Sequence, residues 1–493
     1  MKKTQLIRRL ALLPLVLALA ACAVGPEYER PASATPAAYK EAALPPAEAG
    51  SWKTAQPSEA ALRGAWWKIF NDETLNRLED EAQQANQDLK AAAARLAQAR
   101  ALQREARSGF FPSVDAGFGP TRQRPSAVSQ GLPDGTPTQP VTTWRAQGTV
   151  SYEADLFGRV ASTAEAATAD AQRSEALYRS VLLALQADVA TMYFLAREQD
   201  AESRLYRQTV QLRTETLQLI QRRYDAGDIS ELDLARARAE LASAQSEALG
   251  IERRRAASEH ALAVLLGRAP SDFSLPPQPL ETVAVSVPAG LPSALLERRP
   301  DIAAAERAMA AANARVGVAK SAFFPRLDIT GAFGFESSEL GNLFEWSSRS
   351  FLLGPLVGTA LSLPLFDGGR RQAGLDRARA VYEEDVARYR QTVLNAFREV
   401  EDNLANLRIL ADQTRAQDDA VQAAARAARL SHTQYREGSI SYLDVIEADR
   451  SVLLQQRVAV QLSGERARST VDLVRALGGG WENPVPAEQV AAR

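Results

Sequence analysis

The stretch from Trp144 to Asp155, WRAQGTVSYEAD, decides the fold of this chain. Apolar or small residues occupy every second position, and polar residues occupy the positions between them. This period of two predicts a β-strand with one apolar and one polar side. The strand is long enough to cross a bilayer at a tilt, with its apolar side towards lipid and its polar side towards a wet lumen. A half-buried surface hairpin is the alternative for any single strand of this kind.

A second stretch, Arg326 to Glu336, repeats the alternation, and Val114–Phe118 and Gly354–Leu363 are weaker partners for the two clear strands. Four strands cannot close a barrel, because the smallest membrane barrels need about eight. An open sheet edge in lipid would leave backbone groups unsatisfied. The chain is therefore expected to oligomerise, with twelve strands in a trimer or eight in a dimer.

Long helices are the second expectation. Neither Val160–Ala226 nor Leu375–Glu437 contains Gly or Pro, and both are rich in Ala, Leu, Arg, Gln and Glu. Each predicts a rod of about 90–100 Å at the rise of an α-helix. Three-then-four spacing in the first rod predicts the narrow seam of a coiled coil, formed by Leu182, Leu185, Val189, Met192 and Ala196. Shorter helices are expected at Trp66–Ser108, Glu231–Leu266, Asp301–Ala322 and Tyr442–Leu477.

The chain is also an internal repeat. Phe110-Phe111-Pro112 returns as Phe323-Phe324-Pro325, and YDAGDISELDL from Tyr224 returns as YREGSISYLDV from Tyr435. Both halves have the same order of helix, hairpin, long helix, turn and helix. The expected divisions are a first repeat at 65–268, an inter-repeat segment at 269–300, a second repeat at 301–478 and a C-terminal tail at 479–493. Pro120–Thr143 and Ser337–Ser350 are expected to be extracellular turns.

The N-terminus carries an export signal. Basic residues precede a short apolar run that ends in Leu19-Ala20-Ala21-Cys22, which looks like a lipobox. We expect a signal peptide at 1–21, lipidation of Cys22 and a lipidated tether at 22–64. The later sequence has no uninterrupted apolar run long enough for a transmembrane helix, so any spanning segment should be β.

Composition argues against several functions. The chain has 2 His, 1 Cys and a formal net charge of -2. No basic field is present to attract nucleic acid. His260 and His432 lie far apart in helical sequence, and no nucleophile–base–orienter set can be assembled. We therefore expect a protein that is not an enzyme and has no cofactor and no metal.

Several motifs together resemble one family. They are the lipobox followed by Val24-Gly25-Pro26-Glu27-Tyr28, the paired Phe-Phe-Pro motifs, the Leu365–Arg370 stretch (LFDGGR) and the two glycine-centred turns. This set is similar to the TolC-type outer-membrane factors, in particular their lipoprotein, NodT-like branch. The resemblance covers nearly the whole mature chain.

The resemblance implies a mainly α-helical fold with a small β-barrel part. A homotrimer would complete a twelve-stranded barrel and a helical periplasmic tunnel, lipid-anchored in the bacterial outer membrane. Its function would be that of a passive exit duct for small molecules, engaged by a periplasmic adaptor and an inner-membrane pump. The cargo stays open: drugs, metals, aromatic compounds or small peptides. The alternative is a lipid-anchored periplasmic coiled-coil scaffold without a channel.

In such ducts the constriction lies at the periplasmic helix tips. The resemblance places Leu443, Asp444 and Glu447 at this aperture, with Asp233 as the matching acid of the first repeat. Three copies would ring the axis with carboxylates that attract cations. For Asp233 and Asp444 a capping box is an equally good explanation, because each follows a serine by three residues. Glu447 lies beyond the first helical turn, so capping does not explain it; the alternative to a gate acid there is a solvated helix face.

The turn glycines are the last candidates. Gly227 and Gly438 should adopt positive φ at a helix C-terminus, and the resemblance implies that adaptor hairpins dock beside them. One departure concerns the latch that closes the tip. Some family members have a basic residue two positions after the glycine, where this chain has Ile440. Which of Arg222, Arg223 and Arg436 pairs with an acid is not readable from the sequence.

Overall fold

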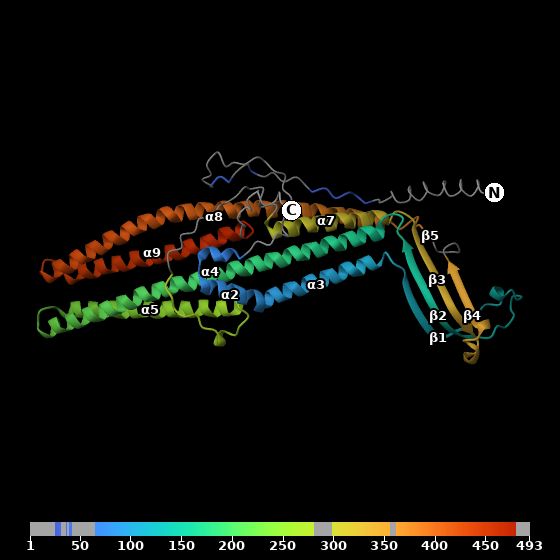
Figure 1. Cartoon of the computed structure of the whole chain (residues 1–493), viewed down its shortest axis with the longest axis horizontal. Helices are drawn as coiled ribbons and strands as arrows, with labels where there is room; N and C mark the ends of the chain where they lie inside the picture. The colour runs from blue at the N-terminus through green and yellow to red at the C-terminus, as the bar shows by residue number, and fades with distance from the viewer. Residues whose placement is uncertain are drawn as a thin grey trace, which may run out of the picture. The chain divides into compact units, whose positions relative to one another are not determined.

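A computed structural model describes residues 25–30, 36, 39–41, 65–280, 298–354 and 361–479, and every structural statement below concerns these residues. Two helices dominate the chain (Figure 1): α4, Arg159–Asp225, and α8, Arg370–Arg436, each of 67 residues. Each is followed by a tight turn and a return helix of 35 residues, α5 at Glu231–Leu265 and α9 at Tyr442–Ala476. These four helices confirm the predicted rods and their return helices. No described helix combines the length and hydropathy that crossing a membrane requires.

The helix expected at Trp66–Ser108 is instead three elements. They are a 3-10 turn η2 at Trp66–Phe70, α2 at Glu73–Ala85 and α3 at Gln87–Ser108. The break lies at Asn86, whose backbone leaves the helical region with ψ 132°. Its side-chain oxygen accepts from the Leu89 amide at 2.9 Å, and its amide donates to the Leu265 carbonyl at 2.9 Å. Asn86 therefore caps a new helix, which the apolar pattern alone did not reveal. Helix α7 spans Pro300–Ser321, as expected.

The sheet is antiparallel in the order β1-β2-β3-β4. Its strands are β1 at Ser113–Gln123, β2 at Val141–Ala154, β3 at Arg326–Ser337 and β4 at Arg349–Gly354, with β5 at Leu361–Ser362 also pairing with β3. The expected ranges were too short for β1, which runs through Pro120. Proline is tolerated there because β1 is an edge strand of the sheet of one chain. Residues 355–360 of the expected fourth strand lie outside the described residues.

The register places the alternating apolar sets on one face. Ala146 lies opposite Phe335, Gly148 opposite Phe333, and Tyr152 opposite Ile329. At the first two pairs a large side chain faces a small residue, and the Phe333 ring lies against the position where Gly148 would carry a Cβ. The face is exposed in one chain: Phe118, Phe333 and Phe351 are 65%, 55% and 79% exposed. An apolar sheet face of this kind needs a non-aqueous neighbour.

The opposite face is polar. Arg145 pairs with Glu336 across β2 and β3 at 3.1 Å between Nε and Oε2. The Gln147 amide donates to Ser350 Oγ at 2.9 Å. Strands β2 and β3 therefore each have one apolar and one polar side, as the period-two pattern predicted.

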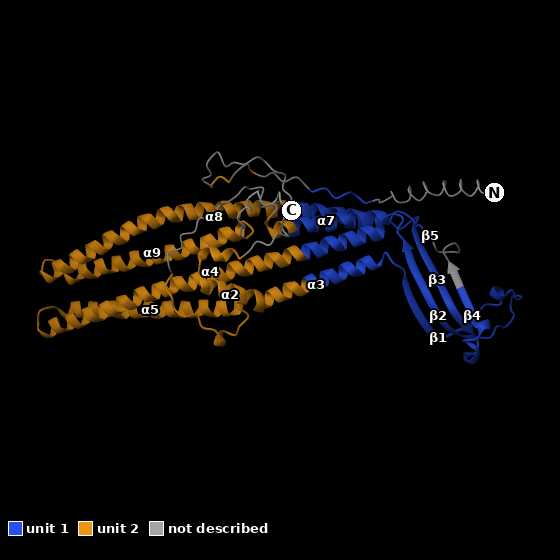
Figure 2. Cartoon of the chain, viewed as in Figure 1, with its two compact units in different colours: residues 1–32, 96–174, 304–389 blue, residues 33–95, 175–303, 390–493 orange. Residues whose placement is uncertain are grey.

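The chain divides into two compact units, coloured in Figure 2. Unit 1 comprises residues 1–32, 96–174 and 304–389 and contains the sheet; unit 2 comprises residues 33–95, 175–303 and 390–493 and contains both helical turns. Both repeats contribute to both units. Cys22 and the expected signal peptide at 1–21 lie outside the described residues.

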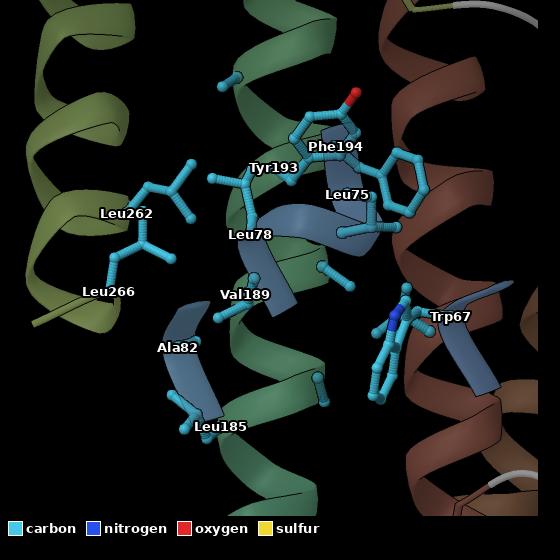
Figure 3. Close-up of a cluster of buried hydrophobic side chains, with 14 of the residues drawn as sticks. Trp67, Leu75, Leu78, Ala82, Leu185, Val189, Tyr193, Phe194, Leu262 and Leu266 are labelled. Atoms are coloured by element: carbon cyan, nitrogen blue, oxygen red, sulfur yellow. The ribbon is translucent and has the colours of Figure 1, made fainter. Parts of the chain in front are cut away.

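The main core of unit 2 lies around α2 and is named the α2 core (Figure 3). Leu75 and Leu78 of α2 pack against Val189 and Tyr193 of α4, while Leu262 approaches from α5. The expected seam on α4 is wrong in width. Its residues are buried or partly buried, but Ala187, Ala190 and Phe194 are buried as well. The face is broader than a coiled-coil seam because α2, α5 and α9 all contribute to this core.

Candidate functional site

The two turns of unit 2 have the same backbone design and lie at the same end of the unit (Figure 1). Gly227 has φ 81° and Gly438 has φ 75°. After Gly227, the Asp228 amide donates to the Arg223 carbonyl at 2.9 Å, and after Gly438 the Ser439 amide donates to the Gln434 carbonyl at 2.9 Å. These bonds close each long helix with a left-handed glycine, as predicted for both positions.

A small apolar cluster, named the tip cluster, joins the two turns. Its buried members come from α4, α5 and α9: Ile220, Leu234, Ala237, Tyr442, Val445 and Ile446. Ile440 is partly buried against it. The isoleucine at the position where some family members have a basic residue therefore contributes to apolar packing. In this chain the contact between the turns is hydrophobic at Ile440.

The predicted aperture residues of the second repeat share one face of α9. Leu443, Asp444 and Glu447 are all exposed, whereas Tyr442, Val445 and Ile446 on the other side are buried. Spacings of three and four residues bring Glu447 next to both Leu443 and Asp444 on the helix surface. The face opposite the tip cluster thus offers one leucine and two carboxylates to solvent.

Asp444 completes a capping box with Ser441. The Ser441 amide donates to Asp444 Oδ2 at 2.9 Å, and the Ser441 hydroxyl donates to the same oxygen at 2.8 Å. These bonds lower the pKa of the Asp444 carboxyl, with the hydroxyl contributing most. The capping explanation is therefore confirmed for Asp444, and its carboxylate is charged and exposed at neutral pH.

Asp233 differs from Asp444. It accepts from the Ser230 hydroxyl at 3.1 Å and pairs with Arg236 at 3.5 Å. The reciprocal bond from the Ser230 amide is not found among the described contacts, so the capping box is only half formed here. Its side chain is 24% exposed. The structure thus brings Asp233 to the same end of unit 2 as Asp444, but with a partner cation of its own.

Tyr435 is a tip residue that the sequence reasoning missed. Arg223 lies over its ring at 5.4 Å, and its ring centroid is 5.6 Å from that of Tyr442. Burial raises the pKa of the Tyr435 hydroxyl, which has no hydrogen-bond partner among the described residues. Among the three arginines considered for the latch, Arg223 is the one that reaches across to the other turn, and it contacts an aromatic ring. The signal was the repeated tyrosine before each turn, at Tyr224 and Tyr435.

Farther along unit 2, buried carboxylates link α9 to α4 and α5; this set is named the polar ladder. Glu198 of α4 pairs with Arg468 of α9. Glu202 accepts from the Gln461 amide of α9 at 2.7 Å. Glu240 of α5 pairs with Arg213 at 2.9 Å and with Arg450 of α9. The sequence alone did not indicate these contacts, because the paired residues lie on different helices and most are more than two hundred positions apart.

No group of three or more His, Cys, Asp or Glu side chains is arranged to hold an ion within the described residues. His432 contacts Asp449 at 2.9 Å across α8 and α9, an ordinary helix-to-helix hydrogen bond. What the tip offers instead is a face of exposed carboxylates beside a small apolar contact.

The chain combines two 67-residue helices with an antiparallel sheet that has an exposed apolar face and, within the described residues, no second partner for either edge strand. This combination defines a class: subunits of outer-membrane channels with long helical parts. The family model described as "Outer membrane efflux protein" matches residues 78–268 and 291–479. The chain belongs to this family, which is a family of transport channels. It is a subunit of a trimeric outer-membrane channel that serves efflux, so the scaffold alternative is not supported.

Relatives with known names are similar over almost their whole length. The toluene efflux pump outer membrane protein TtgI of Pseudomonas putida is 37% identical, with 94% of this chain and 97% of that protein covered. The antibiotic efflux pump outer membrane protein ArpC of Pseudomonas putida is 35% identical, with 94% and 93% covered. The solved outer-membrane channel OprN has a TM-score of 0.84 at 30% identity, with 93% and 100% covered.

Proposed function

We propose that this chain forms the exit duct of a tripartite pump that exports small apolar and amphiphilic compounds across the outer membrane. The observation that carries the proposal is the sheet, whose apolar face is exposed and whose edge strands β1 and β4 have no second partner strand among the described residues. Three copies would pair these edges and turn the apolar face to lipid. The names of TtgI and ArpC, a toluene and an antibiotic efflux protein, support this cargo class.

The cargo proposal is tested by deleting the gene. Toluene and apolar antibiotics should become more toxic to the deletion strain, and expression of the gene should restore tolerance. Small hydrophilic compounds, which fall outside the proposed cargo class, serve as controls. Unchanged sensitivity to every apolar compound would contradict this cargo class.

Cys22 is proposed as the lipid anchor of the mature chain. The support is the Leu19-Ala20-Ala21-Cys22 motif and the basic and apolar residues before it. Mass spectrometry of the mature N-terminus should find an acylated Cys22. Cys22→Ser should yield a protein without acyl chains, and an unmodified wild-type N-terminus would exclude the anchor.

The aperture is proposed to consist of Leu443, Asp444 and Glu447 of α9, with Asp233 of α5 beside it. In a trimer the exposed α9 face would present its two carboxylates three times around the axis. Like charges held close together repel, so opening lowers this repulsion. The same carboxylates concentrate cations at the entrance. The duct itself is passive, and the energy for transport comes from the pump.

The aperture proposal predicts a change in ion selectivity. In planar bilayers the double variant Asp444→Asn and Glu447→Gln should lose most of the cation preference of the wild-type channel. The control removes two carboxylates that are exposed on α8, Asp418→Asn and Asp419→Asn, and should keep the wild-type preference. Equal selectivity of all three channels would exclude Asp444 and Glu447 from the aperture.

The turns at Gly227 and Gly438 are proposed as the docking sites of a periplasmic adaptor. Their exposed backbone and the open space around both glycines support access by another protein. A photo-crosslinker at Ser439, next to Gly438, should capture the adaptor in cells, whereas one at Arg388, far along α8, should not. Capture at Arg388 alone would place docking elsewhere.

A further inference from the structure

Unit 1 contains a groove with a volume of about 850 Å³ formed by α4, α7 and α8. Its walls are mostly small apolar side chains: Ala166, Ala167, Ala312, Val318, Ala319, Ala322, Ala378 and Val381. This volume falls in the range of sites for small molecules, about 300–1,000 Å³. The many alanines leave room between the helix backbones that larger residues would fill.

The charged residues that line this groove are mostly positive. Arg315, Arg370, Arg371 and Arg377 line it, with Asp170 as the one carboxylate in the lining. Asp170 is already paired with Arg315, and Arg371 is held by Asp367 at 2.7 Å. Arg370 and Arg377 are exposed, and neither guanidinium has a hydrogen bond or ion pair within the described residues. Seven residues apart on α8, they lie along the same side of that helix.

In the proposed duct, α4, α7 and α8 form part of the helical wall. The position of residues 25–30 indicates on which side of this wall the groove lies. The Asn313 amide donates to the Pro26 carbonyl at 3.0 Å, and Arg30 pairs with Glu306 at 3.4 Å. At about 100° per residue, Glu306 and Asn313 lie on the side of α7 opposite the groove residues Arg315 and Ala319.

The contact of residues 25–30 with α7 therefore identifies the outer side of the helical wall, given the proposed duct and its lipid anchor. Cys22 precedes Gly25 by three residues, so an acylated Cys22 would hold residues 25–30 outside the wall, where lipid is. The groove, on the other side of α7, then faces the lumen. This step rests on the proposed function; the groove and its charges do not.

We propose that this groove is a binding site for amphiphilic anions, small molecules with an apolar body and a carboxylate or sulfonate group. The apolar body lies on the alanine floor, where its burial removes apolar surface from water. The anionic group meets the guanidinia of Arg370 and Arg377, whose planar fork suits oxyanions. An amphiphilic cation is repelled by the net charge of the lining. A neutral apolar compound lacks the ionic contact.

The test measures dye binding to the trimer in lipid nanodiscs, with empty nanodiscs subtracted. The probe is 8-anilinonaphthalene-1-sulfonate, and its neutral analogue N-phenyl-1-naphthylamine is measured in parallel. The sulfonate dye should bind saturably. Its affinity should fall about tenfold in the double variant Arg370→Gln and Arg377→Gln, the size expected for the loss of two partly exposed charge contacts. Binding of the neutral dye should change little.

A matched control removes two other arginines of α8, Arg379→Gln and Arg388→Gln, which pair with Asp376 and Glu384 outside the groove. This variant should bind the sulfonate dye like wild type. An equal loss of affinity in both variants, or no loss in either, overturns the proposal. Ala319→Leu, which narrows the groove without changing charge, should weaken binding of the sulfonate dye; unchanged binding would also count against the site.

Single-channel conductance separates this proposal from the proposed function. If the protein conducts but dye binding does not depend on Arg370 and Arg377, the groove proposal fails and the duct stands. If binding depends on these arginines but the protein never conducts, the duct fails and the groove stands.

Discussion

The α2 core and the tip cluster belong to the same unit but differ in how firmly they hold the helices. Nineteen buried residues form the α2 core, whereas six form the tip cluster. The carboxylates differ as well: Glu198 and Glu202 are buried near the α2 core, while Asp444 and Glu447 are exposed at the tip. Regions with few buried contacts open at lower cost than well-packed ones. The comparison teaches that the helices separate most easily at the tip cluster, while the α2 core holds them together.

The largest expected effect concerns Glu79 beside the α2 core. Its side chain is fully buried, and in the part of the chain that the structure describes neither carboxylate oxygen has a hydrogen-bond partner. Burial, with a contribution from Asp80, raises its pKa from 4.5 to about 9. The folded state thus keeps a proton that the unfolded chain loses. The contribution to stability is full below pH 4.5 and is lost as pH rises towards about 9.

Thermal unfolding between pH 6 and pH 9 checks this expectation. Wild type should lose on the order of a few kcal/mol of unfolding free energy over this range, whereas Glu79→Gln should lose much less. Glu73→Gln, an exposed position on the same helix, is the control and should behave like wild type. The same pH dependence in wild type and Glu79→Gln would contradict the assignment.

The second effect concerns a glycine inside α9. A Cβ at Gly464 would collide with the Glu198 carboxylate of the polar ladder, whereas a Cβ at Gly250 in α5 would meet nothing within 4 Å. Gly464→Ala should destabilise the protein by about 2–3 kcal/mol through overpacking. Gly250→Ala should stabilise it by about 0.5–1 kcal/mol, because alanine favours the helix. Chemical denaturation measures both; a stabilising Gly464→Ala would mean that Glu198 moves aside freely.

The smallest effect uses two valines of α9, Val474 in the α2 core and Val445 in the tip cluster, which are 0% and 2% exposed. Substitution by alanine removes similar apolar surface, about 1.5 kcal/mol in each case. Val474→Ala should lower the global unfolding temperature. Val445→Ala should mainly speed hydrogen exchange around the turn at Gly438, because this end opens locally. Equal exchange rates at the turn in both variants would contradict the difference between the two regions.

Much of the fold follows from sequence periodicity. The alternation at Trp144–Asp155 and the Gly-free and Pro-free rods predicted β2, α4 and α8 closely, because local pattern and tertiary packing agree there. The break at Asn86 was missed, since its local bond to the Leu89 amide lies within an otherwise helical pattern and its second bond goes to Leu265, far away in the chain. The width of the buried face on α4 also depends on helices that approach from elsewhere.

The candidate site was predictable in part. The glycines at 227 and 438 and the capping by Asp444 depend on local backbone chemistry, which the sequence reveals. The half-formed cap at Asp233 depends on the competing cation Arg236, and the contact of Arg223 with Tyr435 joins two turns separated by the whole inter-repeat distance. Roles at the aperture depend on how neighbouring subunits place the α9 faces, which no local pattern in the sequence encodes.

The two unlike edges of the sheet have a genetic consequence. In a ring of three, every junction joins β1 of one chain to the β4 side of the next, so each copy takes part in two different junctions. One subunit with a defective edge strand leaves a gap in the barrel that the two wild-type subunits cannot close. With equal amounts of healthy and edge-defective chains mixing at random, only about one ring in eight would contain three healthy copies. Edge defects should therefore behave as dominant alleles.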